Sequence, residues 1–312
     1  MGAYLIRRLL QMIPTLLGVA ILIFILFNAV GGDPAQVLGG KISNPEQIAN
    51  IRKQLGVDQP YYVQLAIFFK QIVTFDFGRS WATNELVNRI ITTRLGPTLT
   101  ILIPLLILET GLGILFALGV AYVRGSLTDR AIMMACTVAM SISFLVYIIV
   151  GQYLFGFLLG WFPVQGWSDS FWKNLITYAP LPIILALMVS VAPTLRLYRT
   201  FFLDEIHQDY VRTARAKGLS ERTVMLKHVL RNALIPILTY VAVALPSEMI
   251  GLFLLEKFFS IPGLGREVIV AVERSDFPVI KAITIYLAVF TMILNLAVDF
   301  LYKWVDPRVE LK

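Results

Sequence analysis

Three carboxylic acids lie inside long apolar runs of the sequence, where a charged side chain needs a physical reason. Glu109, Glu248 and Asp299 each sit in a run long enough to cross a lipid bilayer. An ionised side chain at the centre of a membrane costs about 2.5–3.5 kcal/mol on insertion scales, so such groups pair with a neighbour, take up a proton or line a water-filled path. No lysine or arginine lies at a depth that matches Glu109 or Glu248.

Two interpretations therefore stay open for these carboxylates: a hydrogen bond to a neighbouring helix, which we favour for Asp299, or a place on a polar path. Ser247 precedes Glu248, and Asn295 lies one helical turn before Asp299. The candidates for a solute pathway are Glu109, Ser247, Glu248, Asn295 and Asp299. A carboxylate on such a path suits the amino end of a peptide or a metal cation, and the sequence does not decide between them.

Motifs for catalysis are missing from the sequence. It contains no Walker motif, no dinucleotide glycine fingerprint and no nucleophile paired with a base in a loop. Cys136 is the only cysteine, and the two histidines have no cysteine near them, so no metal site is expected. The chain is predicted to be neither an enzyme nor the holder of a cofactor or metal.

The composition is that of a membrane protein. Mean hydropathy is +0.75, 57% of the residues are hydrophobic and 15% are charged, whereas soluble domains carry about 25% charged residues. The net charge of +7 comes from cations in loops between apolar runs, not from a basic surface with interleaved aromatic residues. We therefore expect membrane lipid, and not nucleic acid, as a partner.

Six apolar runs can position these residues as membrane-spanning helices, because a bilayer core of about 30 Å needs about 20 apolar residues. They cover residues 9–30, 98–123, 132–159, 180–198, 236–255 and 279–302. The first run is too long for a cleaved signal peptide. Lysine and arginine concentrate in alternate short loops, and the rule that such loops stay inside places both termini in the cytoplasm.

Of the three external regions between these runs, two have a clear sequence pattern. Residues 31–97 form the one sizeable polar segment, with amphipathic helices expected near 44–55 and 61–74. Turn residues around a short helix near 265–274 mark the second region. Pro104, Pro193 and Pro246 lie inside apolar runs, where each removes a backbone donor and is expected to kink its helix.

The only long polar passage in the second half of the chain runs from 204 to 236 and is strongly basic. Its pattern predicts one helix from about 204 to 217, with Asp204 and Glu205 at its start. Gly218 follows as the residue that most easily closes a helix in the left-handed conformation. Ser220 then caps a second helix that ends near 234, before Pro236 starts the next apolar run.

The first of these helices presents a face suited to docking in a groove of another protein. Residues three and four apart share a face, and this one holds Ile206, Tyr210, Thr213, Ala214 and Lys217. The opposite side carries Gln208, Arg212 and Arg215. The alternative is a basic amphipathic loop lying on anionic lipid headgroups, which needs neither the glycine joint nor the paired helices.

This passage resembles the cytoplasmic loop of ABC-importer permeases, which carries an E-A-A-x-x-x-G core. Gly218 matches the glycine and Ala214 the second alanine, while Thr213 and Arg212 replace the first alanine and the glutamate. Arg231 stands where the later proline of the general pattern would be. The run DYVRTARAKGLS followed by H-x-L-R-N-A-L-I-P is similar to the variant in dipeptide, oligopeptide and nickel permeases.

Further motifs extend the resemblance over nearly the whole chain. They are GDPA at 32–35, LGxDxP at 55–60, DFGxS at 76–80, E-x-x-F-x-x-P-G-x-G at 256–265 and the closing Asp306-Pro307-Arg308. The resemblance implies an all-α integral membrane protein with the type I ABC importer permease fold. It has six transmembrane helices and a long periplasmic segment after the first, and it lies in the bacterial cytoplasmic (inner) membrane.

The resemblance also implies a domain organisation. Residues 1–97 would hold the first helix and the periplasmic segment, 98–303 the type-1 transmembrane domain, and 304–312 a cytoplasmic tail. Within the transmembrane domain, 200–235 would form the coupling loop, whose helix at 204–220 seats in a cleft of an ATP-hydrolysing subunit. The residues expected to carry this coupling are Tyr210, Arg212, Thr213, Ala214, Lys217 and Gly218.

The function implied is that of one permease subunit of an ATP-driven importer of di- or oligopeptides. Its expected partners are a second homologous permease, two ABC ATPases that bind the ATP and Mg, and an extracytoplasmic substrate-binding protein. The same architecture importing nickel or another small solute is the alternative. A secondary transporter, which would show internal repeats, and a channel, which would need a selectivity filter, are more remote, as is an intramembrane enzyme.

Overall fold

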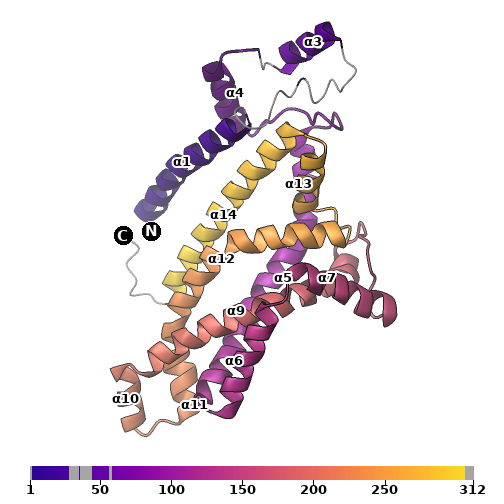
Figure 1. Cartoon of the computed structure of the whole chain (residues 1–312). Coiled ribbons are helices and arrows are strands. Elements are labelled where there is room, and N and C mark those ends of the chain that lie inside the picture. The colour runs from indigo at the N-terminus through magenta and orange to yellow at the C-terminus, as the bar shows by residue number, and fades with distance from the viewer. Residues whose placement is uncertain (1, 28–34, 36–43, 56–57, 306–312) are drawn as a thin grey trace. The chain divides into compact units, whose positions relative to one another are not determined.

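The computed structural model describes residues 2–27, 35, 44–55 and 58–305, and almost all of the elements in these ranges are helices (Figure 1). The chain divides into two compact units. The first unit is built from Met1–Gly96 and Arg266–Leu296, and the second from Pro97–Gly265 and Ala297–Leu311. The prediction of an all-α membrane protein is confirmed.

The α-helices and π-helical segments have the following bounds. The α-helices are α1 (Gly2–Ile25), α3 (Pro45–Leu55), α4 (Tyr61–Thr74), α5 (Val87–Tyr122), α6 (Leu127–Met140), α7 (Phe144–Gly151), α8 (Phe171–Lys173), α9 (Pro180–Ile206), α10 (Asp209–Ala216), α11 (Glu221–Thr223), α12 (Leu230–Phe258), α13 (Leu264–Glu273) and α14 (Phe277–Val305). The π-helical segments are η2 (Gln152–Leu158), η3 (Asn174–Tyr178) and η4 (Val224–Val229).

Within the described residues, five helices are long and apolar enough to cross a membrane, and a sixth span is formed if α6 and α7–η2 are taken together. The helices expected near 44–55, 61–74 and 265–274 are present as α3, α4 and α13. Residues 28–30 of the first expected span lie outside the described residues, as do most of the GDPA motif, Gly56 and Val57 of LGxDxP, and the closing Asp306-Pro307-Arg308.

The third expected span, 132–159, is not one straight helix. It bends by 88° between α6 and α7. Ser141 ends α6 and donates its hydroxyl to the Thr137 carbonyl at 2.9 Å, and Ser143 takes an extended conformation before α7. Serine hydroxyls can hydrogen-bond to the backbone and so compete with helical hydrogen bonds. Two serines within three residues therefore favour a turn here, which the continuous apolar run did not predict.

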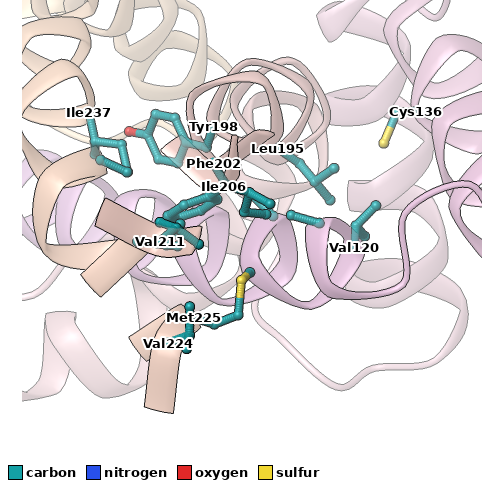
Figure 2. Close-up of a cluster of buried hydrophobic side chains, with 14 of the residues drawn as sticks. Val120, Cys136, Leu195, Tyr198, Phe202, Ile206, Val211, Val224, Met225 and Ile237 are labelled. Carbon is teal, nitrogen blue, oxygen red and sulfur yellow. The ribbon is translucent and has the colours of Figure 1, made fainter. Parts of the chain in front are cut away.

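Helix α9 organises the second unit, where it packs against α6, α7 and α12. Its buried side chains Leu195, Tyr198 and Phe202 lie in a cluster with residues from α5, α6, α10, η4 and α12 (Figure 2). Arg199, on the same helix, forms a two-pronged ion pair with Asp129 at the start of α6, with nitrogen–oxygen distances of 2.8 and 2.7 Å. Paired hydrogen bonds of this kind fix orientation as well as adding energy, so α6 and α9 are held together at this end.

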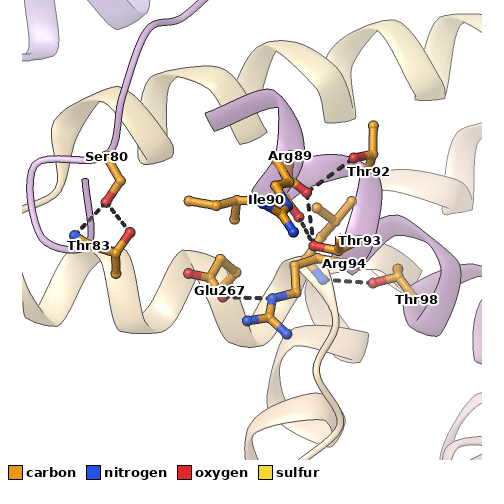
Figure 3. A network of polar contacts seen from close by, with 10 residues as sticks. Ser80, Thr83, Arg89, Ile90, Thr92, Thr93, Arg94, Thr98 and Glu267 are labelled. Carbon is orange, nitrogen blue, oxygen red and sulfur yellow. Dashed lines mark hydrogen bonds and ion pairs between the residues drawn. The ribbon is translucent and has the colours of Figure 1, made fainter. Parts of the chain in front are cut away.

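In the first unit, one carboxylate organises the loop that follows α4. Asp276 is buried and accepts hydrogen bonds from the Ser80 hydroxyl, from Trp81 N at 3.0 Å and from Ala82 N at 3.3 Å. Nearby, Arg94 Nε lies 3.2 Å from Glu267 Oε2, an ion pair between α5 and α13 (Figure 3). The end of the DFGxS motif is therefore held by hydrogen bonds to a side chain almost two hundred residues later in the chain.

A second buried carboxylate, Glu256 at the end of α12, holds the turn that leads into α13. Thr98 Oγ1 donates to Glu256 Oε1 at 2.6 Å and accepts from Leu264 N at 2.8 Å. A Cβ atom built on Gly263 would lie 2.3 Å from the Glu256 carboxylate. Only glycine leaves room for the carboxylate here, so packing explains why Glu256 and Gly263 occur together in the E-x-x-F-x-x-P-G-x-G motif.

Gly265 gives a testable case of such close packing. A Cβ atom at this position would lie 2.6 Å from the backbone Cα of Phe253. We expect Gly265→Ala to destabilise the chain by about 1–3 kcal/mol, as overpacking does. At Gly119, inside α5, an added Cβ meets nothing within 4 Å, so Gly119→Ala is the matched control. Thermal unfolding of the detergent-purified chain measures both; a Gly265→Ala protein as stable as the control would contradict the close approach.

Candidate functional site

The basic passage 204–236 folds differently from its predicted pattern at its beginning. Asp204 and Glu205 lie in the last turn of α9, which ends at Ile206, and α10 begins only at Asp209. The single helix predicted from about 204 to 217 is therefore wrong. His207 and Gln208 separate the two helices, and neither is a residue that normally breaks a helix.

Burial of Val211 accounts for this break. Val211 is fully buried and Ala214 is 5% exposed, and both belong to the cluster that surrounds Phe202 and Met225 (Figure 2). If α9 continued as one helix, Val211 and Ala214 would lie on a different side from Phe202 and could not both reach the buried cluster. The chain therefore turns at 207–208 so that α10 can place its apolar side on the core of its own unit.

Gly218 forms the joint between α10 and α11, as predicted. Its φ of +77° lies in the left-handed region, and a Cβ atom there would meet nothing within 4 Å. After the joint, Ser220 accepts a hydrogen bond from Thr223 N, which confirms it as the cap of the second helix. The conformation at Gly218 is thus required by the backbone and not by crowding.

An ion pair closes the joint across Gly218. Arg215 Nε lies 3.0 Å from Glu221 Oε2, and Arg215 Nη2 lies 2.6 Å from Glu221 Oε1. The hydrogen bonds to Glu221 raise the pKa of Arg215 above its ordinary value. Because both side chains remain partly exposed, the pair serves mainly to fix the angle between α10 and α11 and adds little to stability.

Tyr210 lies against the core and is only half exposed. Its hydroxyl donates to the Glu205 carboxylate at the end of α9, a contact that bridges the 207–208 turn. Burial raises the pKa of Tyr210 to about 12, and the neighbouring Glu205 carboxylate acts in the same direction. Tyr210 therefore stays a neutral hydrogen-bond donor at physiological pH and holds α10 to α9.

The residues predicted to share one docking face thus separate into two groups. Ala214 and Tyr210 lie toward the core of the chain, and Ile206 belongs to α9. The exposed Asp209 at the start of α10 lies 3.6 Å from Arg212 in an ion pair. The exposed residues from Arg212 to the joint are Arg212, Thr213, Ala216, Lys217, Gly218 and Leu219. We call these six residues the α10 surface. The docking face predicted from residue spacing did not include Ala216 and Leu219. A leucine next to Gly218, in an otherwise polar passage, was a signal for an apolar contact with a partner.

The second helix of the passage does not end near 234. From Glu221 the chain runs without a break through α11, η4 and α12 to Phe258, and this helical run is long and apolar enough to contain a membrane span. Pro236, expected to start a separate apolar run, lies inside α12, as does Pro246. Proline is tolerated within membrane helices when neighbouring groups satisfy the freed backbone carbonyl.

Among the predicted pathway residues, Glu109 has a partner on a neighbouring helix. It is 7% exposed and accepts a hydrogen bond of 2.8 Å from Thr194 Oγ1, so α5 and α9 are linked at membrane depth. Ser190, one turn before Thr194, has a buried hydroxyl with no hydrogen-bond partner in the described part of the chain. The hydrogen-bond interpretation therefore applies to Glu109, and a further polar group is available beside it.

Ser247 and Glu248 lie on a cavity of about 170 Å³. Its other walls are formed by Leu105 of α5, Phe144 of α7, Ala186 and Val189 of α9, and Gly251, Leu252 and Leu255 of α12. No hydrogen bond or ion pair joins Glu248 to the residues that the structure describes, and its electrostatic neighbour is Glu109. The cavity thus has one unneutralised carboxylate in apolar walls.

Neither of the last two candidates is among the residues that line this cavity. Asp299 is 9% exposed, in the part of α14 that belongs to the second unit, and Asn295 lies in the part that belongs to the first. The side-chain carbonyl of Asn295 is buried with no partner among the described residues. Over those same residues, no group of three or more histidine, cysteine, aspartate or glutamate side chains has the arrangement of a metal site.

Comparison with known proteins gives matches over both parts of the chain. Residues 109–311 match the family described as "Binding-protein-dependent transport system inner membrane component", and residues 1–102 match the N-terminal family of the same membrane components. The glutathione transport system permease protein GsiC of Salmonella choleraesuis is 36% identical over 310 residues, with 99% of each chain covered. A putative peptide transport system permease protein of Brucella abortus is 34% identical over 316 residues, with the same coverage.

These matches confirm the resemblance to the peptide-permease family that the loop and external motifs indicated. They extend over both units and over all of the elements described above. The chain therefore belongs to the inner membrane components of binding-protein-dependent transport systems, the multi-pass permeases of ABC importers.

Proposed function

We propose that this chain is one of two permease subunits in an importer of di- or oligopeptides, driven by two separate ATPase chains. The observation that carries the proposal is the α10 surface, exposed on one side of a short helix whose other side is fixed to the core by Val211 and Ala214. A connector held in this way moves with the helices behind it instead of bending alone.

The α10 surface suits a groove in a partner better than a lipid surface. Arg212 exposes 73% of its side chain and Lys217 is also exposed. Ala216, Gly218 and Leu219 are exposed as well, and each is small or apolar. Lipid binding would favour a broad apolar face with large side chains. A glycine joint, two small side chains and two cations match instead a narrow cleft with acidic edges.

The names of the relatives support peptides as the substrate class. One is named for glutathione, itself a tripeptide, and another for peptide transport. In the proposed cycle, ATP binding closes the two ATPases, the α10 surface moves with their clefts, and the permease pair turns from inward-facing to outward-facing. Both termini of this chain would lie in the cytoplasm, with 31–97 on the side where a substrate-binding protein docks.

Purification and transport test this proposal together. An affinity tag on this chain is expected to retain two ATPase chains and a second permease, and the reconstituted assembly is expected to take up labelled dipeptides with ATP and binding protein present. Labelled nickel serves as the competing solute in the same vesicles. Uptake by this chain alone, without ATPases, would contradict the importer mechanism, and uptake of nickel but not dipeptides would contradict the substrate class.

A further inference from the structure

The cavity beside Glu248 has an arrangement that neither the fold nor the coupling mechanism requires. Its walls come from α5, α7, α9 and α12, all within the second unit, and apart from Ser247 and Glu248 they are apolar or glycine. An ionised carboxylate in such walls loses most of its hydration and is costly unless a cation or several donors compensate it. The described part of the chain supplies neither to Glu248.

The two carboxylates of this helical core differ in one respect. Glu109 receives a hydrogen bond from Thr194 and is nearly inaccessible. Glu248 is only partly buried and borders open space. Where both carboxylates are ionised they repel each other, so a positive charge that enters the cavity is attracted to both.

We propose that this cavity receives the positively charged ammonium group of the transported solute, with Glu248 as its counter-ion. The inference rests on the proposed function and narrows it, because it names the part of the peptide that this chain would contact. A peptide with a free amino end carries this group, and so do amino acids and small amines.

The size and lining of the cavity fit such a group. A cavity of about 150 Å³ with apolar walls accommodates a molecule as large as benzene, so about 170 Å³ holds an ammonium group with a short apolar side chain. Glu248 would form a charge-assisted hydrogen bond with the ammonium group. Ser247 adds an acceptor, and the aromatic ring of Phe144 lines the same cavity.

Binding to the assembled importer tests the cavity independently of transport. The probe is ¹⁵N-labelled propylammonium, measured by saturation-transfer NMR on the tagged complex in nanodiscs, with uncharged propionamide as the comparison. We expect propylammonium, and not propionamide, to bind, and Glu248→Gln to weaken this binding at least tenfold. Equal binding to the wild-type and Glu248→Gln complexes would overturn the inference, as would no binding to an intact wild-type complex, because a cation of the second permease would then already neutralise Glu248.

Two further variants separate charge from shape. Glu248→Asp keeps the charge and is expected to bind propylammonium within about threefold of wild type. Gly251→Leu keeps the carboxylate but fills the cavity, since a Cβ there has only the Phe144 ring at 3.7 Å, and is expected to abolish binding. Losing binding equally in Glu248→Asp and Glu248→Gln, with the complex still assembled, would overturn the assignment of charge as the cause.

Transport then distinguishes this inference from the proposed function. Wild-type vesicles are expected to take up a free dipeptide at least tenfold faster than its N-acetylated form, and Glu248→Gln is expected to reduce this ratio to within about twofold. If wild-type vesicles take up no peptide while propylammonium still binds, the substrate class fails and the ammonium site stands. If peptide uptake is normal and does not depend on Glu248, the result supports the peptide-importer function and contradicts the ammonium site.

Discussion

Replacing Gly218 with valine is expected to reduce ATP-driven uptake at least tenfold while the chain remains in the membrane. Gly218 has a φ of +77° with open space around it, so valine meets no steric neighbour but resists the left-handed conformation at a cost of about 1–2 kcal/mol. The joint would open, and with it the ion pair between Arg215 and Glu221. Uptake and ATP hydrolysis in reconstituted vesicles measure the loss of coupling.

Gly160 provides the matched control for this variant. It also has a left-handed φ, of +63°, and nothing within 4 Å of an added Cβ, but it lies in the loop after η2, far along the chain from α10. Gly160→Val is expected to keep uptake within about twofold of wild type at equal amounts of protein in the membrane. If both variants lose uptake equally, backbone strain in general, and not the α10–α11 joint, is responsible.

A tryptophan at Thr213 is expected to block assembly with the ATPases, whereas a tryptophan at Ala214 is expected to unfold the segment. Thr213 is exposed on the α10 surface, so added bulk there changes only what can approach. Ala214 packs in the core cluster, where overpacking costs about 1–3 kcal/mol or more. The first variant should lower ATPase recovery on pull-down at least fivefold with normal thermal stability.

The two measurements are made on the same pair of proteins. Ala214→Trp should lower the unfolding temperature of the purified chain, and Thr213→Trp should not. Normal ATPase recovery with Thr213→Trp would show that the α10 surface is not the docking surface. A stable Ala214→Trp protein that fails to bind ATPase would instead restore the docking face predicted from residue spacing alone.

Sequence patterns predicted most of the helices because apolar length and turn residues are local properties. The joint at Gly218 and the cap at Ser220 were predicted for the same reason, since their conformation depends on the residue itself. The break at His207–Gln208 was not predicted, because it follows from burying Val211 in a core that distant helices build. One unexpected turn changed which side chains of α10 are exposed, and so moved Ala214 from the surface to the interior.

The polar residues show the same limit. The sequence identified Glu109 and Glu248 as costly but could not tell their environments apart. Thr194 on α9, and the walls that α7 and α9 contribute to the cavity, are far from both residues in the chain. The partners of Asp276 and Glu256 were likewise invisible, although Glu256 lies in a motif that the sequence singled out. The sequence shows which polar residues need a partner, and the three-dimensional fold shows which partner each one has.

The unbroken run from Glu221 to Phe258 has a mechanical consequence. At about 1.5 Å per residue, the helical path from Glu221 to Glu248 is roughly 40 Å long, with no loop in it to absorb a displacement. A hydrogen-bonded helix resists shortening, while Pro236 and Pro246 each remove a donor and let it flex sideways. A push on the cytosolic end would therefore arrive at the cavity wall as a tilt, which could open or shut the space around the carboxylate without any change in its own helix.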